Sequence, residues 1–168
     1  MTEPSWRPVF RSPQATITKV LHSQSFETSR EQARLILEDA SALRVLADRV
    51  RAIDKVDAPL SAIADRVDAA VRFLHAHADR LEKSDSHAAD AGSPVDAPSP
   101  EARTAGVISE ARERLVVAAM HYLVTPIDVV PDFRAGGYID DVMLLSWVFG
   151  AAADELEPFL DEAEALRR

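Results

Sequence analysis

Four aspartates in one short stretch are the residues of this chain with the clearest potential for chemistry. Asp128 and Asp132 precede a Gly-Gly pair and Asp140 and Asp141 follow it, within HYLVTPIDVVPDFRAGGYIDDVMLLSW, residues 121–147. If the two flanking segments pair, their carboxylates approach one another, and hard oxygen ligands of this kind suit Mg²⁺ or Ca²⁺. The candidate metal ligands are Asp128, Asp132 and Asp140, because adjacent helical positions such as 140 and 141 point about 100° apart.

A structural role explains the same aspartates without a cation. Thr125-Pro126 has the residue order of a helix start, and Asp128 at its third position can accept hydrogen bonds from backbone N–H groups. Asp140 and Asp141 open the next helical segment, one as its cap and the other in its first turn. The pattern favours capping, and the cation site stays open as an alternative.

The motif Y-x-x-x-P-x-D-x-x-P-D-F…G-Y-x-D-D resembles the signature of the YkvA-like domain-of-unknown-function family of small bacterial helical proteins. The matching positions are Tyr122, Pro126, Asp128, Pro131, Asp132, Phe133, Gly137, Tyr138, Asp140 and Asp141. The resemblance extends over about residues 107–156. It implies an α-helical hairpin module, which in some members lies at or near a membrane, and it implies no established activity or catalytic residue. Arg134 and Ala135 stand where the family tends to be apolar, which weakens a membrane interpretation.

Apolar spacing predicts an all-α protein whose residues 28–83 form a helical hairpin. Thr28 and Glu31 have the spacing of a capping box at its start. Leu43 and Val50, seven residues apart, belong to the apolar stripe of its first helix. The stripe of the second helix consists of Leu60, Ile63, Val67, Ala70, Leu74 and Leu81.

Composition divides the rest of the chain into three further parts. Residues 1–27 are predicted to be flexible apart from a short helix that opens at Pro13. Residues 84–99, rich in Ala, Asp, Ser and Pro, are predicted to be a disordered linker. Residues 100–168 are predicted to be the YkvA-like helical module. Its first long helix is predicted to bury Val107, Ile108, Ala111, Leu115, Ala118 and Tyr122. The segment 142–153 is apolar nearly all round, which predicts a central or partner-bound helix, and Pro158 is predicted to open the last one.

Charge and composition limit the partners of the protein. The 168 residues have a net charge of −9, and the chain from Thr104 onward has 5 Arg against 12 Asp and Glu. Nucleic acid is therefore a disfavoured partner, because its binding depends on Lys and Arg. There is no Cys, which excludes thiol chemistry. No apolar run reaches the roughly 18–20 residues that span a bilayer. These features predict a cytoplasmic protein, with the inner face of the membrane as a further location.

The sequence favours a non-catalytic helical interaction or scaffold module over an enzyme. The predicted partner is another protein or a second copy of the chain. No catalytic residue, cofactor or small-molecule substrate is indicated, because nucleophile-elbow and phosphate-binding glycine motifs are missing. One alternative is a protein dependent on Mg²⁺ or Ca²⁺, such as a hydrolase, that uses the aspartate loop. The other is a module that contacts the membrane peripherally.

Three histidines are assigned structural roles. His75 and His77 lie two positions apart on a helix, so they face different ways and are expected to be solvated rather than to share a metal. His121 precedes the motif loop and is within reach of one of its aspartates, in a structural contact rather than as a base.

Overall fold

The computed structural model describes residues 13–56, 59–88, 100–125 and 139–165. Within these ranges every regular element is helical, which confirms the all-α prediction. The elements are α1 (Pro13–Leu21), α2 (Gln24–Leu37), α3 (Ala40–Arg51), the 3-10 turn η1 (Leu60–Ile63), α4 (Ala64–Ala88), α5 (Pro100–Leu123), α6 (Ile139–Ala151) and α7 (Ala153–Ala165).

A serine, not the predicted threonine, caps α2. The Ser23 hydroxyl accepts a hydrogen bond from the backbone N–H of Phe26 at 3.2 Å, which satisfies one of the unpaired donors at the helix start. Thr28 lies inside the helix, where its hydroxyl donates to the carbonyl of Gln24 at 3.0 Å. The predicted helix start at Thr28 is therefore wrong, because Ser23 already provides a cap one turn earlier.

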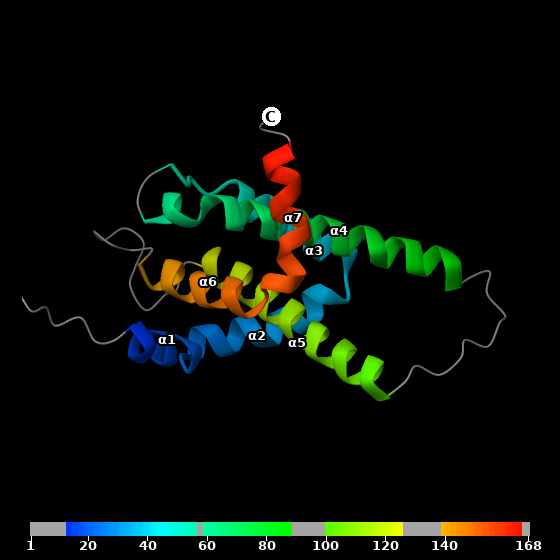
Figure 1. Ribbon diagram of the computed structural model, residues 1–168, viewed down its shortest axis with the longest axis horizontal. Coiled ribbons are helices and arrows are strands. Elements are labelled where there is room, and N and C mark those ends of the chain that lie inside the picture. The colour runs from blue at the N-terminus through cyan, green and yellow to red at the C-terminus, as the bar shows by residue number, and fades with distance from the viewer. Residues whose placement is uncertain (1–12, 57–58, 89–99, 126–138, 166–168) are drawn as a thin grey trace, which may run out of the picture.

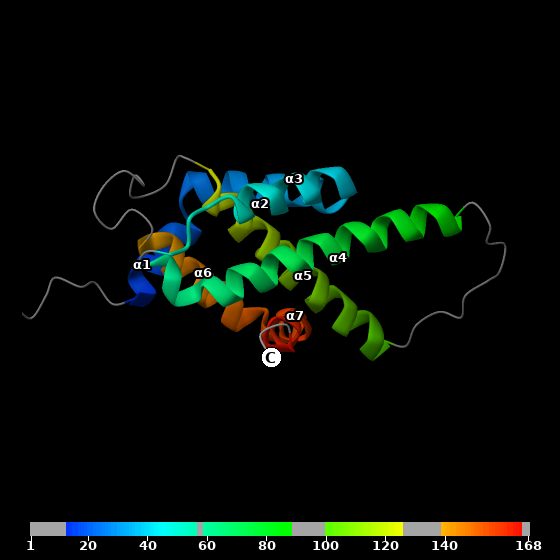
Figure 2. The same cartoon turned by 90° about the horizontal axis from the view of Figure 1, so that it is seen from above.

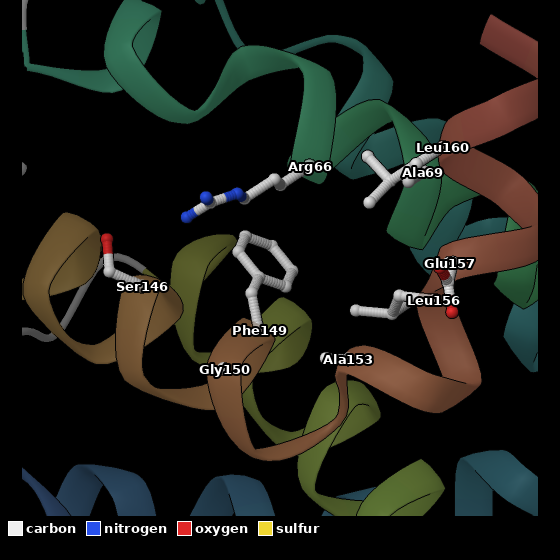
Figure 3. A pocket seen from close by; sticks show the side chains of 9 residues that line it. All are labelled: Arg66, Ala69, Ser146, Phe149, Gly150, Ala153, Leu156, Glu157 and Leu160. Carbon is white, nitrogen blue, oxygen red and sulfur yellow. The ribbon is translucent and has the colours of Figure 1, made fainter.

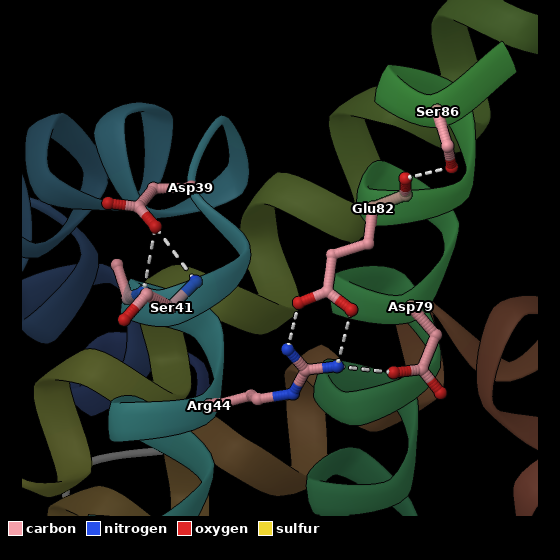
Figure 4. A network of polar contacts seen from close by, with 7 residues as sticks. Asp39, Ser41, Arg44, Asp79, Glu82 and Ser86 are labelled. Carbon is pink, nitrogen blue, oxygen red and sulfur yellow. Dashed lines mark hydrogen bonds and ion pairs between the residues drawn. The ribbon is translucent and has the colours of Figure 1, made fainter.

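A second cap divides the single helix predicted for the first arm of the hairpin. The Asp39 carboxylate accepts from the N–H groups of Ser41 and Ala42 at 2.8 and 3.1 Å, which starts α3 in a new direction (Figure 4). The hairpin predicted for residues 28–83 contains three α-helices, α2, α3 and α4, because this aspartate interrupts the seven-residue stripe.

The helices on both sides of residues 89–99 share one hydrophobic core. α2 packs along α5, α3 along α4, α1 against α6, and α7 against α4, which it crosses steeply (Figures 1 and 2). The Phe26 ring of α2 meets the Tyr122 ring of α5 edge to face, with 5.8 Å between the centroids. The helices of the predicted C-terminal module therefore pack directly on those of the predicted N-terminal part.

The stripe predicted for the second arm of the hairpin forms part of this core. Leu60, Ile63, Val67, Ala70 and Leu74 are buried, and Leu81 is half-buried. α4 continues to Ala88, so the first residues of the predicted linker are helical. The remainder of that linker lies outside the described residues.

The long helix α5 is buried in its second half only. Each residue from Val116 to Met120 is 0% exposed. In the first half, Val107 is 66% and Ile108 47% exposed, and Ala111 is exposed too. The prediction that these three residues are buried is wrong, because the start of α5 diverges from the end of α4 and no described helix covers it (Figure 2).

The apolar segment after the loop forms α6, but it ends sooner than predicted. The chain bends at Ala152, and α7 begins at Ala153 rather than at Pro158, which lies inside it. Asp154 and Glu155 supply the acidic first turn of α7, where carboxylates complement the helix dipole. In the described residues no helix has the length and apolarity that crossing a membrane requires.

Candidate functional site

Most of the predicted motif lies outside the described residues. This holds for Pro126, Asp128, Pro131, Asp132, Phe133, Gly137 and Tyr138. Asp140 belongs to α6, but its side chain is outside the description. The cation site at Asp128, Asp132 and Asp140 therefore stays a prediction. Among the side chains that are described, no group of three or more His, Asp or Glu could hold a metal ion.

The two described motif residues, Tyr122 and Asp141, are both buried. Asp141 is 1% exposed and takes part in a polar or electrostatic interaction. α6 begins at Ile139, so Asp140 and Asp141 both lie in its first turn, and the expectation that one of them is the cap is not confirmed. A buried carboxylate needs polar or ionic partners, and at this position the helix dipole favours its charge. Asp141 thus places a carboxylate inside the core at the start of α6.

His121 contacts a buried serine in a small polar pocket at the end of α5. Its Nδ1 lies 3.0 Å from the hydroxyl of Ser29 on α2, and Thr125 donates to its carbonyl oxygen at 2.6 Å. Burial, with a smaller contribution from Arg49, lowers the pKa of His121 below its ordinary value of 6.5. A neutral imidazole beside a hydroxyl can act as a base. Ser29 is fully buried, however, so the described contact is a structural link between α5 and α2.

His75 and His77 contact residues of two different helices. His75 Nε2 lies 3.2 Å from Arg51 on α3, and His77 Nδ1 lies 3.6 Å from Glu113 on α5. The expectation that both are solvated is wrong for His77, because its side chain is largely buried beneath α5. That burial lowers its pKa, as does Arg80, while Glu113 acts in the opposite direction.

A groove containing an exposed tryptophan lies where α1, α2, α5 and α6 meet. We call it the Trp147 groove, and its lining residues are Leu21, His22, Phe26, Arg30, Ala111, Arg114, Leu115 and Trp147. Its volume is about 390 Å³. Trp147 is 41% exposed although it belongs to the most apolar helix of the chain. The apolar character of α6 indicated a central or partner-bound helix. The groove itself could not be predicted, because its lining comes from four helices whose packing the sequence pattern does not show.

A second cleft lies between α4, α6 and α7. We call it the Arg66 cleft, and it is lined by Arg66, Ala69, Ser146, Phe149, Gly150, Ala153, Leu156, Glu157 and Leu160 (Figure 3). Its volume is about 370 Å³. Its lining is mostly apolar, with Arg66 and Ser146 toward one end and Glu157 toward the other. Nothing in the sequence signals this cleft, because its walls come from distant parts of the chain.

A surface network of charges fastens α3 to α4. Arg44 donates to Asp79 at 2.6 Å and makes a two-pronged contact with Glu82 (Figure 4). These carboxylates raise the pKa of Arg44, and the guanidinium in turn lowers the pKa of Glu82. One arginine of α3 bridges two carboxylates of α4, so the network holds these two helices together.

The described residues form an all-α helical bundle. One segment of the chain is similar to a known family. The family model described as "Protein of unknown function (DUF1232)" matches residues 114–147. This match runs from the buried half of α5 to Trp147, and it is consistent with the YkvA-like resemblance. No match was found among curated proteins or solved structures. Because the family has no described function, the similarity assigns no activity to the buried residues or to the clefts.

Proposed function

We propose that the protein is a non-catalytic helical interaction module that binds a protein partner through the Trp147 groove. The observation that carries this proposal is the exposure of Trp147 at the groove, beside the partly exposed Leu21 and Leu115. Trp147, at 41% exposure, forms one wall. Clusters of exposed apolar side chains on soluble proteins mark interaction sites, and tryptophan is among the residues that contribute most to binding energy at such sites.

The apolar surface continues from the groove along α5. Ile108, Ala111 and Leu115 follow one another at spacings of three and four residues, so they lie on one face of the helix. Ala111 and Leu115 line the groove with Trp147. Ile108, 47% exposed, extends the same face by one turn. This geometry suits a partner helix laid along α5 with its apolar side toward the groove.

The charged residues at the groove are already neutralised within the chain. Arg30 pairs with Glu27 at 3.3 Å and Arg114 with Glu110 at 2.5 Å. A partner therefore gains little from charge at this site, and apolar contact dominates recognition. Such a surface fits an apolar segment of another protein or a second copy of this chain.

Photo-crosslinking in cells of the source organism tests this proposal. A photoreactive phenylalanine analogue replaces Trp147 and, as the matched control, Val45, an exposed residue on α3 outside the groove. We expect a discrete adduct only from position 147, and we expect Ile108→Lys to abolish it. An adduct of twice the chain mass would identify a second copy as the partner. Equal labelling from positions 45 and 147, or labelling that survives Ile108→Lys, would contradict the proposal.

The cation-dependent alternative has a separate test, because it rests on Asp128, Asp132 and Asp140. A ligand that binds only the folded state raises the Tm. We expect no change in Tm with Mg²⁺ or Ca²⁺. A rise that Asp128→Asn removes would make this alternative the leading function. The cytoplasmic location and the peripheral membrane contact also stay predictions.

A further inference from the structure

We infer that the Arg66 cleft binds a small free amphiphile with a single anionic head group, of which a medium-chain carboxylate is the simplest example. This inference goes beyond the proposed interaction function. The cleft shares no lining residue with the Trp147 groove, so the two sites can fail or succeed independently.

The size and lining of the cleft suit one short apolar chain. Its volume of about 370 Å³ lies at the lower end of the range that ligand pockets occupy. Phe149, Leu156 and Leu160 provide apolar surface from α6 and α7, and Ala69 closes the α4 side without filling the space. The space accommodates a single chain rather than the two chains of a phospholipid.

Arg66 supplies a positive charge at one end of this apolar surface. Two other arginines of the same helix are engaged: Arg72 Nε donates to the carbonyl of Phe159 at 2.9 Å, and Arg80 pairs with Glu113 at 3.3 Å. Arg66, in contrast, makes no hydrogen bond or ion pair with any residue that the structure describes. An arginine with its fork of donors unused, beside an apolar cleft, is suited to a carboxylate.

The other polar groups of the cleft fix the orientation of the ligand. The guanidinium of Arg66 extends from α4 toward the α6 side, where the Ser146 hydroxyl lies (Figure 3). Glu157 lies toward the opposite end, so it repels an anionic head there. The head group therefore lies near Arg66 and Ser146, and the chain lies over Phe149. The net charge of −9 selects against ligands with several negative charges.

Calorimetric titration of the full chain with octanoate and with octan-1-ol tests the inference. We expect octanoate to bind, and Arg66→Gln to weaken it roughly tenfold or more through loss of a charge-assisted hydrogen bond. Octan-1-ol should bind more weakly than octanoate and should be insensitive to Arg66→Gln. Arg49→Gln on α3, outside the cleft, is the matched control and should leave octanoate binding unchanged. Arg66 is exposed, so its replacement leaves the core intact.

Two glycine substitutions, one inside the cleft and one outside it, give a second, independent measurement. At both Gly150, which lines the cleft, and Gly106 on α5, an added Cβ has no atom within 4 Å, so both positions accept a side chain. We expect Gly150→Leu to reduce octanoate affinity and Gly106→Leu to leave it unchanged. The inference is overturned by equal octanoate affinity in wild type and Arg66→Gln. Octan-1-ol binding as tightly as octanoate would also overturn the assignment of a free anionic ligand. So would binding to phosphatidylglycerol vesicles that Arg66→Gln abolishes.

Discussion

The two halves of α5 belong to one unbroken helix but have opposite environments. From Val116 to Met120 every side chain is enclosed, because α2 lies along this half and α6 packs against the same helix. From Thr104 to Ile108 every residue is exposed. The apolar residues Val107 and Ile108 show that an apolar stripe predicts burial only where another helix arrives to cover it.

This difference assigns the two halves of α5 to different tasks, the enclosed half to stability and the exposed half to the proposed recognition. The enclosed half supports the core and belongs to the segment that matches the DUF1232 family, residues 114–147. The exposed half lies before that segment. Its apolar side chains are therefore available for contact, while those of the enclosed half are committed to folding.

The largest expected effect comes from replacing an alanine by aspartate in each half of α5. Ala119→Asp places a carboxylate among fully enclosed apolar neighbours, and we expect a loss of at least about 3 kcal/mol in the free energy of unfolding. Ala105→Asp, on the exposed half, should cost no more than about 0.7 kcal/mol, which is the range of helix propensities. Urea denaturation followed by circular dichroism measures both. Similar losses in the two variants would contradict the comparison.

Hydrogen exchange provides the next contrast without mutation. Amides from Val116 to Met120 should exchange only through global unfolding, because their half of α5 is held by the core. Amides from Thr104 to Ile108 should exchange through local opening of the helix end, at least about a hundredfold faster. Exchange followed by mass spectrometry with overlapping peptides gives both rates. Uniform protection along α5 would mean that something covers the exposed half in solution.

Acidification should destabilise the enclosed half through His121. Its pKa is lowered in the folded state, so near pH 6.5 the unfolded chain takes up a proton more readily than the folded chain does. The stability that this histidine contributes while neutral is therefore fully present above about pH 6.5, and it decreases as the pH falls below that value. Chemical denaturation across pH 5–8 measures this slope, to which His77 also contributes in the same direction.

The matched variants for this prediction are His121→Gln and His22→Gln. We expect His121→Gln to make the pH dependence shallower, because it removes one of the two histidines named above whose pKa is lowered by burial. His22 is exposed, so His22→Gln controls for the loss of a histidine at the surface. An unchanged slope in His121→Gln would show that burial of this imidazole does not disfavour its protonation.

The smallest expected effect is a gain in stability in the exposed half. Gly106 lies inside α5, and an added Cβ would meet no other atom within 4 Å. Gly106→Ala should therefore raise the free energy of unfolding by about 0.5–1 kcal/mol, because alanine restricts the unfolded chain and favours the helix. Gly150→Ala in α6 meets the same conditions and should give a similar gain. A loss of stability in Gly106→Ala would indicate that this half of α5 makes a contact beyond those of the described residues.

The sequence predicted the parts of the fold that depend on one helix at a time. Val67, Ala70 and Leu74 are buried as their spacing indicated, because an amphipathic pattern reports on the helix that carries it. Asp39 was missed as a cap, since the seven-residue stripe continues through Leu43 and hides the break. The hydrogen bonds of this cap form only because the backbone turns at Asp39, and the spacing of apolar residues does not reveal that turn.

The candidate sites were less accessible to sequence reasoning. The aspartate motif gave specific metal candidates, but only Tyr122 and Asp141 have described side chains, and both are buried. Arg66 carries no sequence signal, because an arginine on a polar helix face is ordinary. It becomes notable only when α6 and α7 place Phe149 and Leu156 beside it.

The packing of α2 along α5 has a consequence for how the family segment is kept folded. The DUF1232-like segment contributes the enclosed half of α5, and residues of α2, from another part of the chain, cover it. Because both belong to one polypeptide, the cover is present at a high effective concentration that does not depend on how much protein the cell makes. Cleavage between residues 89 and 99 would turn this contact into a bimolecular one, and dilution alone would then uncover α5.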